Sequence, residues 1–286
     1  MKILITGAAG FIGSNLLPRL SAEHEVVALT RKPESRSLAP GATIAVDLAR
    51  SAANWQLPTR VDSVIHLAQA NVPFPDCANE MFAVNTVATQ TLLDYARLAG
   101  ARQFILASSG DVYGARLGLA KESDETHPES FYAVTKRASE LLTFSYREYL
   151  QPCVLRLFQP FGPGQSNRLI PKLADRIRLG ESVKLNKDGR PHVTPFYIAD
   201  VVSAFLRAVD GSLAGTVNLA GDTRVSVREL AGAIGCALGR EPRFEETVEE
   251  AGDVMGSNDL MKQTLGDWEM VSLTEGLART FGGQGG

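Results

Sequence analysis

Short apolar runs alternate with longer amphipathic stretches through the first half of the chain. The runs are rich in Ile, Val and Leu and lack the polar alternation of a strand with one face in water. Such runs are typical of parallel strands that are covered on both faces. They predict strands at Lys2–Thr6, Glu25–Thr30, Thr43–Val46, Ser63–Leu67, Gln103–Ala107 and Cys153–Phe158.

Two longer stretches, Glu80–Ala99 and Ser130–Tyr149, carry apolar side chains at steps of three and four residues. This spacing places them on one face of a helix. Alternating strands and helices predict an α/β fold with a doubly wound parallel sheet and right-handed crossovers. The two stripes are Met81, Val84, Ala88, Leu92, Tyr95 and Ala99, and Phe131, Val134, Ala138, Leu141, Leu142 and Ser145.

The second half of the chain is less regular and contains more glycine and proline. Its composition predicts a loop at Gln159–Ser166. We therefore predict a first domain over residues 1–160, to which a strand near 215–221 returns, and a smaller lobe over 161–286. The elements expected here are helices at Arg168–Leu179, Ala199–Val209 and Ser226–Leu238, the last capped by Ser226, and strands at Ser182–Leu185 and Gly215–Ala220.

Composition narrows the class of protein. The 286 residues include 29 Lys and Arg against 32 Asp and Glu, a net charge of −3. Nucleic-acid and anionic-membrane proteins need a basic excess, so neither partner is expected. No apolar run is long enough for a membrane helix, and the pattern of the first residues leads us to expect no signal peptide. Three scattered cysteines predict free thiols in the cytoplasm, and no histidine has metal-ligand spacing, so no metal site is expected.

A glycine-rich segment follows the first predicted strand. Thr6–Gly13 reads TGAAGFIG and lies between this strand and a helix, and its candidate cofactor-binding residues are Gly7, Gly10, Phe11, Ile12 and Gly13. Gly7 permits a tight strand-to-helix turn, Gly10 lets the backbone approach a pyrophosphate, and Gly13 lets the helix pack on the strand. The phosphates would lie at the helix N-terminus. The segment predicts a Rossmann-type dinucleotide-binding domain.

The next strands bear on the choice between NAD and NADP. The second strand ends in Thr30-Arg31-Lys32, without the carboxylate that selects NAD. Arg31 and Lys32 can pair with a ribose 2′-phosphate, which favours NADP, although both can also be plain solvated cations. Asp47, which precedes Leu48, is placed either to accept from the adenine amino group or to be a surface carboxylate.

A second constellation combines Tyr132 and Lys136 with Ser109. Positions four apart share a helix face, so the Lys136 ammonium can stabilise the Tyr132 phenolate. A tyrosine with its ordinary pKa near 10 is otherwise a poor general base. Ser109 follows the fifth strand and can hydrogen-bond the reacting oxygen.

Together these segments resemble the extended short-chain dehydrogenases/reductases, in the NAD-dependent epimerase/dehydratase branch. The matching segments are Thr6–Gly13, Asp47-Leu48, His66–Ala68, Asn85–Thr89, Ser108–Gly114, Tyr132–Lys136, Leu155–Phe158, Phe161–Gly164 and Phe196–Asp200. The resemblance implies that Ser109, Tyr132 and Lys136 are the catalytic trio. It also implies a cofactor cleft lined by Leu67, Ala68 and Asn85, and a homodimer through the helices near 80–99 and 130–149.

This chain departs from the family pattern at positions that determine the reaction and the binding of the substrate. Nucleotide-sugar dehydratases carry an Asp-Glu pair where this chain has Gly110 and Asp111, which argues against elimination chemistry. The arginine that binds the diphosphate in relatives is replaced within Val193–Pro195. The candidate substrate-binding residues are Gln69, Ser109, Gln159, Arg168 and Arg190.

The sequence therefore predicts an NAD(P)-dependent epimerase or oxidoreductase that acts on a sugar, expected to be nucleotide-linked. The first domain would bind the dinucleotide, and the C-terminal lobe mainly the substrate. One alternative is an NADPH-dependent ketoreductase. Another is a binding module that senses the cofactor without catalysis, because fold alone does not imply chemistry.

Overall fold

The computed structural model describes residues 1–31, 42–50, 55–186, 189–249 and 251–282. The chain forms two compact units. The first comprises Met1–Val112, Thr126–Arg156 and Val202–Val217, and the second comprises Tyr113–Glu125, Leu157–Val201 and Asn218–Gly286.

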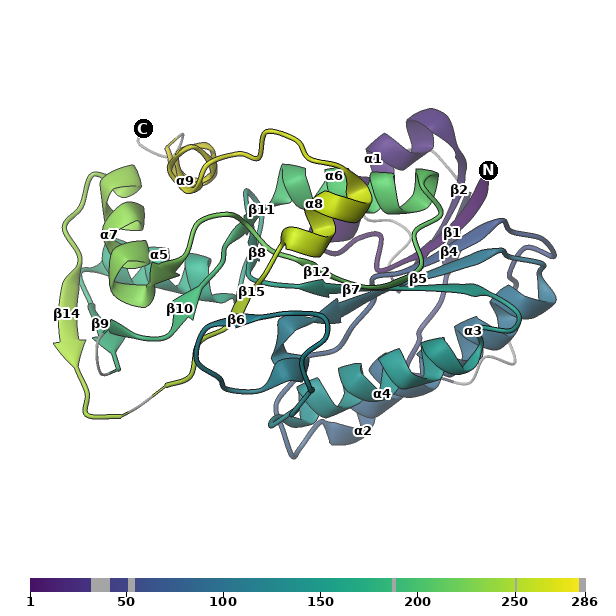
Figure 1. Cartoon of the computed structure of the whole chain (residues 1–286), viewed down its shortest axis with the longest axis horizontal. Coiled ribbons are helices and arrows are strands. Elements are labelled where there is room, and N and C mark those ends of the chain that lie inside the picture. Colours follow the sequence, from purple (N-terminus) through teal and green to yellow (C-terminus); the bar gives the residue numbers. More distant parts are fainter. Residues whose placement is uncertain (32–41, 51–54, 187–188, 250, 283–286) are drawn as a thin grey trace. The chain divides into compact units, whose positions relative to one another are not determined.

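A seven-stranded sheet crosses the first unit in the order β12-β7-β5-β4-β1-β2-β3 (Figure 1). The strands from β3 to β5 pair in parallel, and the order reverses direction between β1 and β4. This arrangement confirms the predicted doubly wound α/β fold, in which ligands bind at such a switch point. The strands are β1 (Lys2–Thr6), β2 (Glu25–Thr30), β3 (Ala42–Ala45), β4 (Ser63–His66), β5 (Gln103–Ser109), β7 (Gln151–Leu157) and β12 (Gly215–Leu219).

Helices lie on both faces of this sheet. Helices α2, α3 and α4, with the turn η2 that joins the first two, cover one face, and α1 lies on the other with the part of α6 that belongs to the first unit (Figure 1). The predicted Glu80–Ala99 helix is interrupted by a π-helical turn, η2. The bounds are α1 (Phe11–Glu23), α2 (Ala78–Phe82), η2 (Ala83–Val87), α3 (Ala88–Leu98), the 3₁₀ turn η3 (Gly110–Tyr113), α4 (Phe131–Ser145) and α6 (Ile198–Asp210).

The core of the first unit lies between the sheet and α3. Leu92 of the predicted stripe is fully buried against the strands, and so are Leu93 and Ala96, which the stripe did not include. Burying a side chain of this size contributes about 1.5–3 kcal/mol relative to exposure. The strand residues of this core include Leu4, Val27, Val64, Phe104, Leu106 and Val154.

Helix α4 has a different distribution of side chains. Its buried side includes Tyr132, Lys136 and Glu140, whereas Val134 and Leu141 are about half exposed, at 46% and 56%. The apolar stripe read from the sequence is therefore not the side that faces the sheet. The sheet-facing side is polar because its groups find hydrogen-bond partners there.

The second unit contains short paired strands and four helices among its described residues. The predicted helix at Ser226–Leu238 is confirmed, with Ser226 as N-cap in a capping box with Glu229. The expected loop Gln159–Ser166 contains a short strand, β8, which pairs with β11. The elements are β6 (Leu119–Ala120), β8 (Pro160–Phe161), α5 (Leu169–Leu179), β9 (Ser182–Leu185), β10 (His192–Val193), β11 (Phe196–Tyr197), β13 (Val225–Ser226), α7 (Val227–Leu238), β14 (Arg243–Glu246), β15 (Met255–Gly256), α8 (Asp259–Leu265) and α9 (Leu273–Phe281).

Among the residues that the structure describes, no helix has the length and apolar character needed to cross a membrane.

Candidate active site

The glycine-rich turn joins β1 to α1 at the carboxyl edge of the sheet. Gly7 has a positive φ of 69°, and a Cβ there would lie 2.7 Å from the backbone N of Ala68. A Cβ on Gly13 would lie 2.2 Å from the carbonyl O of Gly7. Glycine is therefore required at both positions by backbone packing. The turn lies where the ends of β1 and β4 meet.

Helix α1 begins without a side-chain cap. Its N-cap residue is Gly10, and Phe11, Ile12 and Gly13 form the first turn. The first N–H groups of a helix have no partner within the helix and favour an anion. A Cβ on Gly10 would come within 3.1 Å of the Gly7 carbonyl O. This narrow, uncapped turn fits the pyrophosphate of a dinucleotide.

The residues expected near the adenosine lie after β2 and β3. Arg31 is largely exposed, and its guanidinium is 3.9 Å from Glu80 Oε1. Lys32 lies outside the described residues. Asp47 accepts hydrogen bonds from the backbone N of Ala49 at 3.1 Å and from Arg50 Nε at 3.2 Å, so it stabilises its own turn. Leu48 packs against the core.

The segment after β4 is held by Asn85, which η2 presents toward it. Asn85 Oδ1 accepts from the backbone N of Ala70 at 2.7 Å, and Nδ2 donates to the Ala70 carbonyl O at 2.9 Å. The same Nδ2 donates to Thr135 Oγ1 on α4 at 2.9 Å. Both amide protons are thus donated within the protein, and Asn85 links the segment Leu67–Ala70 to α4. Single π turns are frequent at functional sites.

His66 is buried at the end of β4 between two threonines. Its Nδ1 is 2.6 Å from Thr6 Oγ1 and its Nε2 is 3.1 Å from Thr89 Oγ1. The Thr89 hydroxyl donates to the Asn85 carbonyl O, so it accepts from Nε2–H. With the single ring proton on Nε2, Nδ1 is an acceptor, so the Thr6 hydroxyl, which accepts from the Ala68 N–H, donates to Nδ1. Burial, with a smaller effect of the Lys136 charge, lowers the pKa of His66 to about 3. His66 is therefore a neutral core residue.

This histidine should make the protein less stable in acid. Below about pH 6.5 the unfolded chain takes up a proton that folded His66 refuses until about pH 3, so stability falls as pH falls in this window. The slope due to His66 approaches about 1.4 kcal/mol per pH unit. We expect urea unfolding at pH 7.5, 6.0 and 5.0 to show this loss in wild type and not in His66→Gln. Parallel stability curves for the two proteins would contradict it.

Tyr132 and Lys136 both lie on the buried side of α4. The Tyr132 hydroxyl donates to Gln69 Oε1 at 2.5 Å. Lys136 is 1% exposed, and its Nζ donates to the carbonyl O of Ala107 in β5 at 2.5 Å. Burial lowers the pKa of Lys136 to about 8, and the charge of Glu140 acts in the opposite direction. Lys136 is thus an ammonium at neutral pH and titrates close to it.

Ser109 ends β5, two residues after the carbonyl that Lys136 contacts. It is partly exposed, and its Oγ accepts from the backbone N of Asp111 at 3.2 Å. The structure therefore brings the strand end of Ser109 and the helix side of Lys136 together. Gln69, a candidate substrate-binding residue, contacts Tyr132 directly. Its role as a partner of the phenol was not foreseen from the sequence, because 63 residues separate the two.

Gln159, Arg168 and Arg190 belong to the second unit. Gln159 precedes β8 with φ of 43°, and Arg168 is the exposed N-cap residue of α5. Arg190 NH1 donates to Asp253 Oδ1 at 2.8 Å, and that carboxylate also accepts from His192. The charge of Arg190 is thus paired within the protein. Thr194, at the place of the missing arginine, is buried, and its Oγ1 accepts from the Gly256 N–H at 3.1 Å.

Comparison with known proteins gives one family and several full-length relatives. The NAD dependent epimerase/dehydratase family matches residues 3–220. A UDP-glucose 4-epimerase of Mycolicibacterium smegmatis is 31% identical over 310 residues, covering 98% of this chain and 97% of the relative. A dTDP-4-dehydro-6-deoxy-D-allose reductase of a Streptomyces species is 30% identical, covering 85% of this chain and 82% of the relative.

A solved structure agrees with these relatives. MoeE5 in complex with UDP-glucuronic acid and NAD is 29% identical and superposes with a TM-score of 0.84, over 99% of this chain and 98% of that chain. The similarity thus extends through both units.

Proposed function

Because the chain belongs to the NAD-dependent epimerase/dehydratase family, we propose that it transfers a hydride at a hydroxyl-bearing carbon of a nucleotide-linked sugar. The observation that carries this proposal is the placement of Tyr132 and Lys136 on the buried side of α4, with Lys136 bonded to the strand that ends in Ser109. A bound nicotinamide ring would accept the hydride and return it.

Residues of the first unit would bind the cofactor, orient the sugar oxygen and transfer its proton. The uncapped first turn of α1 holds the pyrophosphate. Ser109 Oγ fixes the sugar oxygen, and Tyr132 Oη takes its proton when the carbon is oxidised and returns it on reduction. The Lys136 ammonium stabilises the phenolate and holds the nicotinamide ribose. We assign the dinucleotide to the first unit, and recognition of the sugar mainly to the second, with Gln159 and Arg168 as contacts.

Identifying the cofactor and the product tests this function. The molecule released on denaturation is identified by mass spectrometry, and the protein is incubated with UDP-, dTDP- and GDP-linked hydroxy and keto sugars. An epimerase interconverts the sugars without added cofactor, as the similarity to a UDP-glucose 4-epimerase favours. Absence of hydride transfer across the panel would contradict the proposal and favour a non-catalytic binding module.

A second candidate, an NADPH-dependent reductase, is favoured by Arg31 and by the similarity to a sugar-nucleotide reductase. Arg31 is largely exposed at the end of β2, and its long contact with Glu80 leaves it able to meet a 2′-phosphate. A charge-assisted hydrogen bond there contributes about 1.5–3 kcal/mol, or roughly a 10- to 150-fold preference for NADP.

Replacing Arg31 tests the cofactor preference directly. We expect wild type to bind NADP more tightly than NAD, and Arg31→Ala to weaken NADP binding selectively. Titration of both cofactors by fluorescence measures the two dissociation constants in each protein. Tighter binding of NAD by wild type, or equal losses for both cofactors, would contradict the preference.

We also propose that the protein is a homodimer through the helices that include α2, η2, α3 and α4. Apolar side chains remain about half exposed on these helices at Phe82, Val87, Val134 and Leu141. Such side chains favour burial against a second copy. We expect Leu141→Asp to sediment as a monomer. Leu179→Asp, at an exposed leucine of α5 in the second unit, should sediment as wild type does. A monomeric wild type would contradict the assignment.

A further inference from the structure

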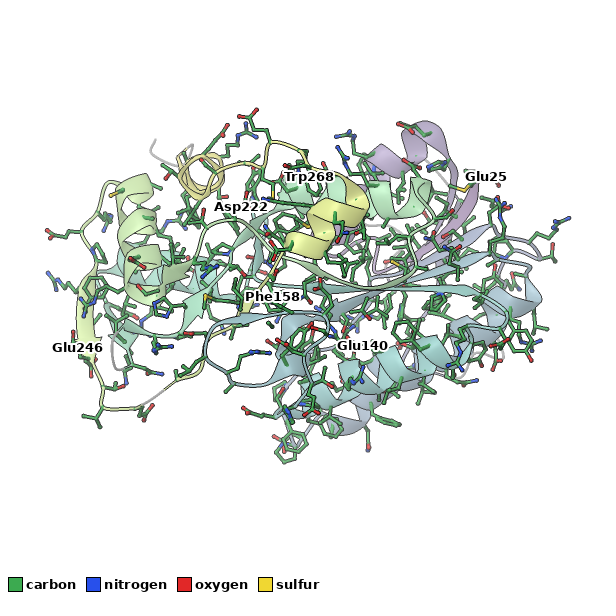
Figure 2. All side chains as sticks on the ribbon, in the orientation of Figure 1. Glu25, Glu140, Phe158, Asp222, Glu246 and Trp268 are labelled. Carbon is green, nitrogen blue, oxygen red and sulfur yellow. The ribbon has the colours of Figure 1, made fainter. Side chains whose placement is uncertain are left out.

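A buried carboxylate lies one helical turn after Lys136. Glu140 is fully buried between α4 and the sheet (Figure 2). Its Oε1 accepts from Arg156 Nε at 2.9 Å and from Ser108 Oγ at 2.6 Å. Its Oε2 accepts from Arg156 NH2 at 2.7 Å and from Arg137 NH1 at 2.9 Å. Each oxygen therefore has two donors, which is close to the full capacity of a carboxylate.

This carboxylate joins the three elements around the proposed catalytic residues. It belongs to the helix of Tyr132 and Lys136, and Ser108 immediately precedes Ser109 at the end of β5. Arg156 reaches it from β7. Lys136 Nζ meets the same strand at the Ala107 carbonyl O. The Glu140 carboxylate thus connects helix α4, which carries Tyr132 and Lys136, with the end of β5, which carries Ser109.

We propose that Glu140 is a positioning residue: its buried carboxylate, four residues after Lys136 on the same side of α4, keeps the Lys136 ammonium charged, and its bond to Ser108 fixes the end of β5 that Lys136 contacts. This inference rests on the proposed function, in which the ammonium serves both the phenol and the ribose. The carboxylate acts through Lys136 and Ser108 and touches neither ligand.

The charges around Lys136 support this role. Burial favours the neutral amine and brings the pKa of Lys136 down to about 8, whereas the Glu140 charge raises it. Burial by itself would raise the pKa of Glu140, but the hydrogen bonds and charge of Arg156, with Ser108 and Arg137, lower it overall. Glu140 is therefore an anion at neutral pH. Three other charged or titratable side chains lie around Lys136 and Glu140. His66 is neutral, and Arg156 and Arg137 are cations that pair with Glu140.

Glu140→Gln removes the charge and keeps the shape. Cofactor affinity, measured without substrate, should fall at high pH as Lys136 loses its proton, and we call this fall the alkaline limb. We expect the limb to move about one pH unit lower, because Lys136 loses a neighbouring opposite charge that favours its protonated form. Affinity at pH 8 should fall about fivefold or more, with less than a twofold change at pH 6. The limb of kcat/KM should move with it, since both report the free enzyme.

Arg137→Gln is the matched control, because Arg137 contacts the same carboxylate from a partly exposed position. Its alkaline limb should stay at the wild-type pH or move slightly higher. Glu140→Asp keeps the charge and should restore the wild-type limb. If Glu140→Gln does not fold, because Arg156 is left buried and unpaired, the double variant Glu140→Gln/Arg156→Met removes both charges. Its limb should lie at a lower pH than that of Arg156→Met, which lacks the same cation and keeps the carboxylate.

Two failures are distinguishable. A wild type that binds neither NAD nor NADP overturns the proposed function itself. If the wild type binds cofactor but the limb of Glu140→Gln lies at the wild-type pH, or that of the double variant lies at the pH of Arg156→Met, the role of Glu140 is overturned and its ion pair with Arg156 is purely structural.

Discussion

Tyr132→Phe is expected to lower kcat by about 10²- to 10⁴-fold, the usual contribution of a positioned acid–base group. Phenylalanine keeps the ring that packs with Met81 and Ala70 and removes only the hydroxyl that donates to Gln69. Folding and cofactor affinity should therefore stay close to wild type. Steady-state rates, with a circular dichroism melt and a cofactor titration on the same sample, separate the loss of chemistry from a loss of structure.

Tyr146→Phe provides the control. Tyr146 follows α4 as its C-cap residue, and its hydroxyl donates to Asp94 at 2.7 Å. The variant loses one hydrogen bond, worth about 1 kcal/mol of stability, and should retain its turnover. Equal turnover in Tyr132→Phe and wild type would remove Tyr132 from the proposed proton transfer.

Gly13→Ala is expected to abolish measurable cofactor binding. The new Cβ would lie 2.2 Å from the Gly7 carbonyl O and 2.6 Å from Ala8 Cα, and both are backbone atoms. Overpacking of this kind costs about 1–3 kcal/mol of stability, and the turn must move to relieve it. Each backbone N–H that the displaced turn no longer presents to the phosphate costs about 1.5–3 kcal/mol of binding free energy, or roughly 10- to 150-fold in affinity.

The same substitution at Gly232 is its control. Gly232 lies inside α7, and a Cβ there meets no atom within 4 Å. Alanine in a helix interior should raise the free energy of unfolding by about 0.5–1 kcal/mol and leave cofactor affinity unchanged. Calorimetric titration of both variants measures the two affinities. Wild-type affinity in Gly13→Ala would show that the turn tolerates a side chain, against its proposed role.

Sequence periodicity was sufficient for most elements of the sheet. The predicted strands Lys2–Thr6 and Glu25–Thr30 have the bounds of β1 and β2, because runs buried on both faces leave a continuous apolar signal. The turn at Gly7 was equally readable, since glycine is the residue that accepts its positive φ. The short strands of the second unit, such as β8, were missed because two-residue pairings produce no period.

The hydrophobic pattern did not predict which face of helix α4 is buried. Its apolar residues Val134 and Leu141 are about half exposed, and its charged residues Lys136 and Glu140 are buried. A pattern assigns burial by apolarity, whereas a polar side chain is buried when other elements supply its partners. Those partners, Ala107 and Arg156, come from β5 and β7. The pattern therefore identified the helix and did not identify its buried face.

The sequence by itself determined the α/β alternation, the glycine turn and the four-residue spacing of Tyr132 and Lys136, since each depends on backbone geometry within a few neighbouring residues. Only the tertiary structure decided that Tyr132 meets Gln69, that Asn85 braces Ala70 and that Glu140 joins Ser108 to Arg156. These contacts depend on which strands become neighbours in the sheet. That choice is made by the packing of the whole chain and has no signature in any short segment.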